Sequence, residues 1–142
     1  MNHLELEFTK VGNQIGEARN IQEVEKLFFE MRNKYESAKE DELTEKIRKT
    51  VVGNLVFVIY KLREFYEEWE KDRELFSSER ELTVAERVIK EVFKVIDKID
   101  KADFPPYFSE KHCSEAKKGL IDFRMKIDEE KERLRICFSG NK

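Results

Sequence analysis

The run at residues 50–60 is the one stretch of this chain that is apolar on every side. It reads Thr-Val-Val-Gly-Asn-Leu-Val-Phe-Val-Ile-Tyr, in a chain of 142 residues of which 42% are charged. The segments around it are amphipathic, with apolar residues spaced by three and four. A segment without a polar face has to be covered from several directions. We therefore expect residues 50–60 to form the centre around which the rest of the chain packs.

Both a helix and a strand are compatible with this run, because Val and Ile favour strands. Apolar residues with the helical period continue on both sides of the run without turn signals, which favours a helix. The other strand-like alternation is residues 4–8, and a lone two-stranded ribbon is marginal in water. We predict a helix from about Leu43 to Phe76, with a strand over residues 50–60 as the alternative.

The amino-terminal part carries a helical apolar stripe that changes register between Ala18 and Ile21. Asn20 stands at this point, and Asn20–Glu23 could cap a new helix. Further on, Ser78–Glu81 has the pattern of a capping box, and Ser109 could cap a last helix after Pro105 and Pro106. The prediction is one all-α domain over residues 1–142. It is an antiparallel four-helix bundle of long amphipathic helices, whose first helix is either continuous or split in two.

Two further features concern the core. Asn54 projects into the apolar stripe of the central helix, and we expect a hydrogen-bonded polar group that fixes register. The connection after the fourth helix holds Phe104, Tyr107 and Phe108 around the two prolines. We expect these aromatics to cap one end of the core, with an exposed docking loop as the alternative.

Composition excludes several classes of protein. The net charge of −3 comes from 28 basic and 31 acidic residues that are closely interspersed, which gives no general attraction to nucleic acid or anionic membranes. No segment approaches the roughly 18 apolar residues of a membrane span, and residues 1–7 lack the features of a signal peptide. Abundant charge and only two Gln also fit a heat-adapted source.

The cysteines support a reducing compartment. Cys113 and Cys137 are expected on one helix, 24 residues and therefore about 36 Å apart, too far for a disulfide within the chain. Thiols at helix positions suit a reducing environment, so we predict a cytoplasmic protein without a membrane association.

Paired carboxylates form a candidate catalytic motif. Glu64, Glu67 and Glu70 stand three residues apart, and Asp97 and Asp100 follow on the next predicted helix. This spacing resembles that of the acidic pairs of MazG-like nucleotide pyrophosphohydrolases, which are helical and use magnesium. The resemblance covers spacing only, and it implies a Mg-dependent nucleotide pyrophosphohydrolase as an alternative function. Metal-binding carboxylates of that family face inward, whereas these point away from the apolar stripes, so we expect solvated faces.

Other catalytic sets find little support. The chain has two histidines, His3 and His112, and five scattered glycines that form no phosphate-binding loop. His112 and Cys113 are neighbours whose side chains diverge by about 100° on a helix, which disfavours a shared metal. We predict no catalytic residues, no metal site and no cofactor, so a protein without catalysis is favoured over an enzyme.

A basic ridge is expected on the last helix. Its members are seven residues apart or close to the same line: Lys117, Arg124, Lys131 and Arg135. Such a ridge could contact phosphates, which makes a nucleic-acid-associated bundle a second alternative function. Pairing with acidic residues across a helix interface is the favoured interpretation, because no aromatic residues interleave with the ridge for base stacking.

The central helix has more apolar surface than a simple bundle would cover. Val56, Phe57 and Tyr60 project roughly opposite its main stripe, where a four-helix bundle should show charge. Either the amino-terminal segment or a second copy of the chain should cover this patch, and we favour a two-fold homodimer. The predicted function is a non-catalytic helical interaction or assembly protein that acts through protein–protein contacts with a partner the sequence does not identify.

Overall fold

All regular structure is helical in residues 3–71, 78–104 and 110–140, which are the residues that the computed structural model describes. The five α-helices and two 3₁₀ turns in these residues are α1 (His3–Glu17), α2 (Ile21–Ser37), η1 (Glu40–Glu42), α3 (Glu45–Glu70), α4 (Glu79–Asp97), η3 (Lys101–Asp103) and α5 (Glu110–Gly140). The all-α class is confirmed, and the strand alternative for residues 50–60 is wrong because α3 runs through them. The four-helix bundle is not confirmed, since five helices are present.

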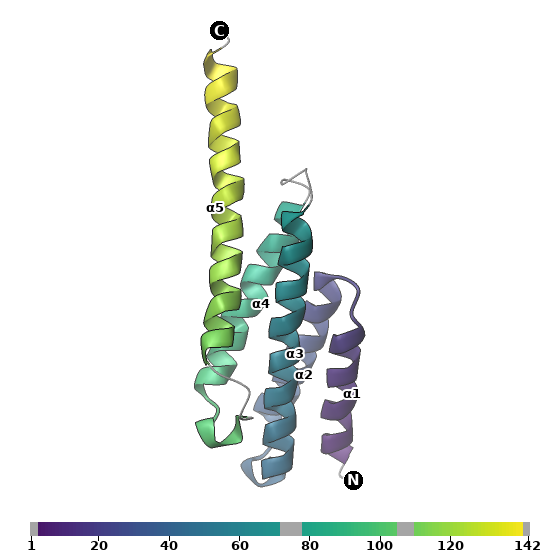
Figure 1. The fold of residues 1–142 in the computed structure, drawn as a ribbon. Coiled ribbons are helices and arrows are strands. Elements are labelled where there is room, and N and C mark those ends of the chain that lie inside the picture. Colours follow the sequence, from purple (N-terminus) through teal and green to yellow (C-terminus); the bar gives the residue numbers. More distant parts are fainter. Residues whose placement is uncertain (1–2, 72–77, 105–109, 141–142) are drawn as a thin grey trace.

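The fifth helix arises from the split at Asn20. The Asn20 side chain accepts a hydrogen bond from the Glu23 backbone N–H, and the Glu23 carboxylate accepts one from the backbone N–H of Arg19, both at 2.9 Å. These bonds satisfy backbone donors at the start of α2 that have no partner within the helix. The chain reverses at this point, so that α2 runs back along α1 (Figure 1). The two-helix alternative for the amino-terminal part is therefore confirmed.

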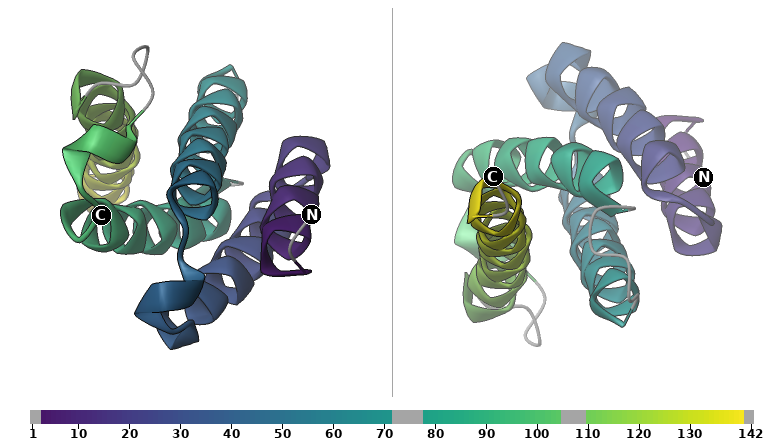
Figure 2. Two further views of the ribbon diagram at one scale, coloured as in Figure 1. Left: turned by 90° about the horizontal axis from the view of Figure 1, so that it is seen from below. Right: turned by 90° about the horizontal axis from the view of Figure 1, so that it is seen from above.

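The helices alternate in direction and form two layers. In Figures 1 and 2, α1, α3 and α5 run in one direction, while α2 and α4 run the opposite way behind them. In this arrangement α3 contacts each of the other four α-helices. This confirms the expectation that the apolar run is the centre of packing.

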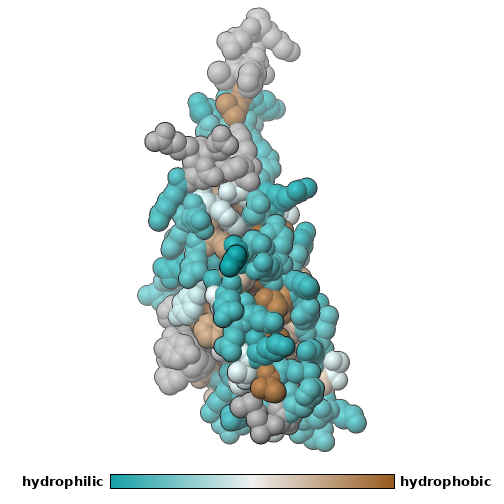
Figure 3. All heavy atoms as spheres, turned by 90° about the vertical axis from the view of Figure 1, so that its right-hand side faces the viewer, coloured by the Kyte–Doolittle hydropathy of each residue, from teal (hydrophilic) through white to brown (hydrophobic). Residues whose placement is uncertain are grey.

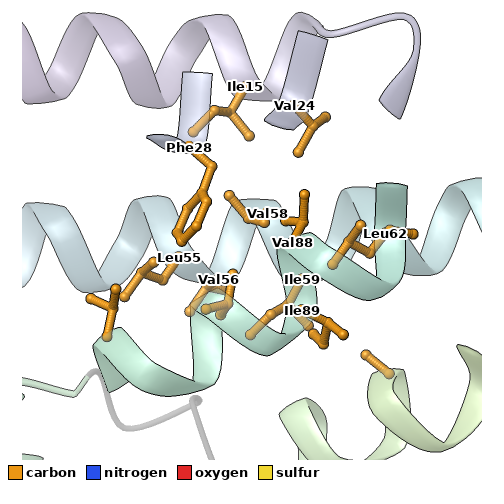
Figure 4. Close-up of a cluster of buried hydrophobic side chains, with 14 of the residues drawn as sticks. Ile15, Val24, Phe28, Leu55, Val56, Val58, Ile59, Leu62, Val88 and Ile89 are labelled. Atoms are coloured by element: carbon orange, nitrogen blue, oxygen red, sulfur yellow. The ribbon is translucent and has the colours of Figure 1, made fainter. Parts of the chain in front are cut away.

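The core lies where the two layers meet. Leu55, Val58 and Leu62 of α3 are fully buried, and they meet side chains from α2 and α4 such as Phe28 and Val88 (Figure 4). Full burial of a side chain of this size contributes about 1.5 to 3 kcal/mol relative to leaving it in water. Packing of this kind holds α3 in place and determines which of its residues reach the surface.

The starts of α3 and α4 differ in how they are capped. The Thr44 side chain begins α3 by accepting a hydrogen bond from the backbone N–H of Ile47 at 3.3 Å. Ser78 occupies the N-cap position of α4, but its side chain makes no cap hydrogen bond, so the predicted capping box is wrong. Its ψ angle of 5° is far from the extended conformation of Asn20 and Thr44, in which a side-chain oxygen reaches the first turn. Ser109 lies outside the described residues.

The predicted aromatic cap is described only in part. Phe104 is partly buried and packs against the hydrophobic core, whereas Tyr107 and Phe108 lie outside the described residues.

Within the described part of the chain, no helix combines the length and apolar character needed to cross a membrane.

Candidate interaction surface

Two aromatic side chains lie exposed in the middle of α3. Phe57 is 47% exposed and Tyr60 is 40% exposed, although both belong to the most apolar segment of the chain. They line a groove of about 570 Å³ together with Gly16 of α1 and a set of charged residues of α3, namely Lys61, Arg63, Glu64 and Glu67. The groove therefore has an aromatic floor with charged residues at one end.

Val56, the third residue of the predicted interface, lies elsewhere. It is 4% exposed and belongs to the hydrophobic core, among the side chains near α4 (Figure 4). Its predicted exposure is wrong because four helices surround α3, which covers more of its circumference than three would. The exposed apolar patch is reduced to Phe57 and Tyr60.

The wall of the groove is set by a close contact between α1 and α3. A Cβ atom at Gly12 would lie 2.1 Å from Asn54 Oδ1, so the two helices approach this closely only because Gly12 has no side chain. The buried Asn54 side chain donates a hydrogen bond to the backbone oxygen of Phe8 at 2.8 Å. The predicted role of Asn54 as a hydrogen-bonded core residue is confirmed.

Further polar contacts hold α1 parallel to α3 at both ends. Near the start of the helices, Lys46 Nζ lies 2.8 Å from Glu5 Oε1. Near the end of α1, Lys61 Nζ donates a hydrogen bond to the Ala18 carbonyl at 3.2 Å, where a helix end leaves carbonyls without partners. These contacts keep α1 to one side of α3 and leave the Phe57 and Tyr60 side chains uncovered.

The basic ridge of α5 lies against α4. Arg124 donates two hydrogen bonds to the Glu86 carboxylate, at 3.2 and 2.6 Å, and these raise the pKa of Arg124. Lys131 pairs with Glu79, and Lys117 Nζ lies 5.1 Å from the centre of the Phe93 ring. The favoured interpretation of interhelical pairing is confirmed for Arg124 and Lys131.

Arg135, the last member of the ridge, pairs with Glu132 of its own helix. The hydrogen bond that Arg135 donates to this carboxylate raises the pKa of Arg135. The ridge is thus one flank of the α4–α5 contact followed by a pair within α5.

The structure does not bring the carboxylates considered for a magnesium site together. Glu64 and Glu67 are exposed beside the groove, and Glu70 lies 3.6 Å from Lys126 Nζ of α5. Asp97 and Asp100 lie at the end of α4, which is the opposite end of the bundle from the end of α3 (Figure 1). Over residues 3–71, 78–104 and 110–140, no three His, Cys, Asp or Glu side chains are placed to share a metal ion.

Two features of the structure were not predicted from the sequence. Arg48 Nε donates a hydrogen bond to buried Asp103 at 2.9 Å, which ties η3 to α3, and no local pattern links residues so far apart in the chain. A second exposed apolar set lies on α5 at Ile121, Met125 and Ile136. The sequence could have predicted this set, because Ile121 and Met125 are four residues apart and lie away from the core stripe of their helix.

One further face of the molecule is largely polar. On the face that includes α1, hydrophilic residues predominate and hydrophobic ones form small separate patches (Figure 3).

Comparison of the chain with known protein families, with curated proteins and with solved structures finds no match.

Proposed function

We propose that this chain is a non-catalytic helical interaction protein that self-associates through the outer face of α3, centred on Phe57 and Tyr60. One observation carries the proposal: two large aromatic side chains remain exposed in the middle of the helix that is otherwise the centre of the core. Aromatic residues contribute strongly to protein–protein interfaces, because they bury a large apolar area when they leave water.

The surroundings of the aromatic pair support an interface. Charged side chains such as Lys61 and Glu64 border the groove, so an apolar centre has a polar rim, as protein interfaces do. By contrast, Arg124 and Lys131 of the basic ridge are engaged by acidic residues of α4, which reduces their availability to phosphates. The proposal includes a cytoplasmic location, supported by the placement of Cys113 and Cys137 far apart on α5.

Sedimentation velocity tests the proposal. We expect the wild-type chain to sediment as a dimer at micromolar concentration and Phe57→Glu to sediment as a monomer, because the change places a charge in the apolar centre. The matched control is Ile121→Glu on α5, since Ile121 is 49% exposed and Phe57 is 47% exposed. The control should remain a dimer. A monomeric wild-type chain at tens of micromolar would overturn the proposal.

A further inference from the structure

The outer face of α3 carries a single stripe of residues. Its members are spaced alternately by four and three, and they are Lys46, Thr50, Gly53, Phe57, Tyr60 and Glu64. Residues at this spacing share one side of a helix. The stripe is basic at its start, aromatic in its second half and acidic at its end.

The stripe has the same spacing when read from either end. Its centre of symmetry is residue 55, so an antiparallel second copy of α3 would place each member opposite another member of the stripe. Lys46 would face Glu64 of the second copy, and Gly53 would face Phe57 of the second copy. Such facing pairs of residues are typical of antiparallel helix pairs. The charged residue at each end of the stripe would then face a residue of opposite charge.

Within the part of the chain that the structure describes, nothing requires a glycine at position 53. Among the described residues, a Cβ atom at Gly53 would contact nothing within 4 Å, as at Gly16, whereas one at Gly12 or Gly119 would collide with Asn54 or Tyr66. No glycine in the described residues has a positive φ angle, so backbone conformation does not require one either. A glycine inside a helix costs about 0.5 to 1 kcal/mol relative to alanine. Its position is explained if the open space receives a side chain of another molecule.

The charges at the ends of the stripe can reach a second copy. The Lys46 and Glu64 side chains are 73% and 68% exposed, and each also has a mostly buried partner within the chain, Glu5 at 2.8 Å and Lys61 at 3.6 Å respectively. The Lys46 ammonium has three N–H donors and the Glu64 carboxylate has two oxygens, so each can contact a second copy while it keeps its partner within the chain. A parallel pairing would instead place Lys46 beside Lys46 and Glu64 beside Glu64.

We infer that two copies of the chain pair through α3 in an antiparallel two-fold arrangement, in which the space at Gly53 of each copy receives Phe57 of the other. The inference rests on the proposed self-association and adds its direction and register. It assigns Gly53, a residue outside the predicted interface, as the receiving site.

Charge reversal tests the direction of pairing. Lys46→Glu and Glu64→Lys each create two like-charge contacts in an antiparallel dimer, so each variant alone should dimerise about tenfold more weakly than the wild-type chain. The double variant, in which both changes are made in one chain, restores both attractions and should recover wild-type affinity. If the double variant stays as weak as the single ones while the wild-type chain is a dimer, the antiparallel pairing is overturned.

Disulfide trapping tests the register. Gly53→Cys chains and Phe57→Cys chains, each with Cys137→Ser, are mixed and oxidised, and the products are identified by mass spectrometry. We expect a disulfide between position 53 of one chain and position 57 of the other. The control mixture of Lys46→Cys and Phe57→Cys should give no disulfide between positions 46 and 57. In the proposed register, position 46 lies opposite position 64 of the second copy, which is about 10 Å along the helix from position 57. A dimer that fails to form the 53–57 disulfide refutes the register only, whereas a wild-type monomer refutes the self-association itself.

Discussion

Two glycines, Gly12 of α1 and Gly53 of α3, lie on different sides of α3 in opposite situations. On the side that faces α1, Gly12 lies against the buried Asn54 side chain, and there is no room for even one additional carbon atom. On the outer side, Gly53 faces open space next to Phe57. A glycine in a helix therefore indicates close packing only when a neighbouring residue occupies the space that a side chain would fill.

The difference is also one of polarity. On the α1 side, the buried Asn54 side chain donates a hydrogen bond to the Phe8 carbonyl, so the polar group at this helix contact has a partner. On the outer side, Phe57 and Tyr60 expose apolar area that nothing within the described residues covers. The first side stabilises the fold, and the second is available for another molecule.

The largest effect is expected for Gly12→Ala. The added methyl group would overlap Asn54, so either the helices separate or the Asn54 hydrogen bond breaks. We expect the free energy of unfolding to fall by about 3 kcal/mol, from overpacking together with a lost buried hydrogen bond. Chemical denaturation measures it. Gly16→Ala is the control, since its Cβ would contact nothing within 4 Å, and equal losses for the two variants would contradict the packing argument.

A smaller loss is expected for Asn54→Ala, about 2 kcal/mol, because a buried polar contact and some packing are removed. The double variant Gly12→Ala, Asn54→Ala is the sharper test, since alanine at position 54 makes room for the methyl group at position 12. The two changes should therefore cost less together than the sum of their separate costs, by about 1 to 2 kcal/mol. Additive losses in denaturation experiments would show that the two residues do not interact.

Gly119→Ala should have an intermediate effect, about 1 kcal/mol. The new methyl group would lie 2.4 Å from Tyr66 Cζ, but this atom is at the end of a partly exposed side chain that can move aside. Burial raises the pKa of Tyr66 in the folded protein, and displacement into water should lower it toward its ordinary value. A spectrophotometric titration of the tyrosines in both proteins measures this change.

The raised pKa of Tyr66 also implies a dependence of stability on pH. Because the unfolded chain ionises first, the contribution of Tyr66 is fully present below about pH 10 and is lost as the pH rises through the folded pKa. Gly119→Ala should weaken this alkaline loss. An unchanged tyrosine titration would mean that the Tyr66 ring stays where it is.

Gly53→Ala should have the smallest effect and the opposite sign. Because the site is open and helical, alanine should increase the free energy of unfolding by about 0.5 to 1 kcal/mol. Thermal unfolding at a concentration where the chain is monomeric measures this gain. A loss of stability comparable to that of Gly119→Ala would remove the contrast between the two sides of α3.

Much of the secondary structure was readable from the sequence because its causes are local. The apolar spacing around residues 50–60 predicted the central helix, and the polar side chains at Asn20–Glu23 predicted that a new helix could begin there. The capping box at Ser78 failed for a reason that a sequence pattern does not contain. The backbone at Ser78 is not extended, so its hydroxyl makes no cap hydrogen bond in the first turn of α4.

The candidate surface was readable only in part. The helical period located Phe57 and Tyr60 away from the main stripe, and they are exposed. It placed Val56 with them, although Val56 is buried, because a helical wheel does not say how many neighbours surround a helix. Likewise, the charge spacing on α5 predicted the ridge, but only the position of α4 pairs Arg124 with Glu86.

The sequence by itself determined that this chain is helical, where most of its helices lie, and that α3 is central with Asn54 inside the core. These properties follow from apolar spacing and from side chains close in the sequence. Only the tertiary structure decided which flank of α3 is closed by α1 and which stays open beside Gly53. That outcome depends on the reversal of the chain at Asn20, which divides the amino-terminal part into two helices and brings a fourth neighbour to α3.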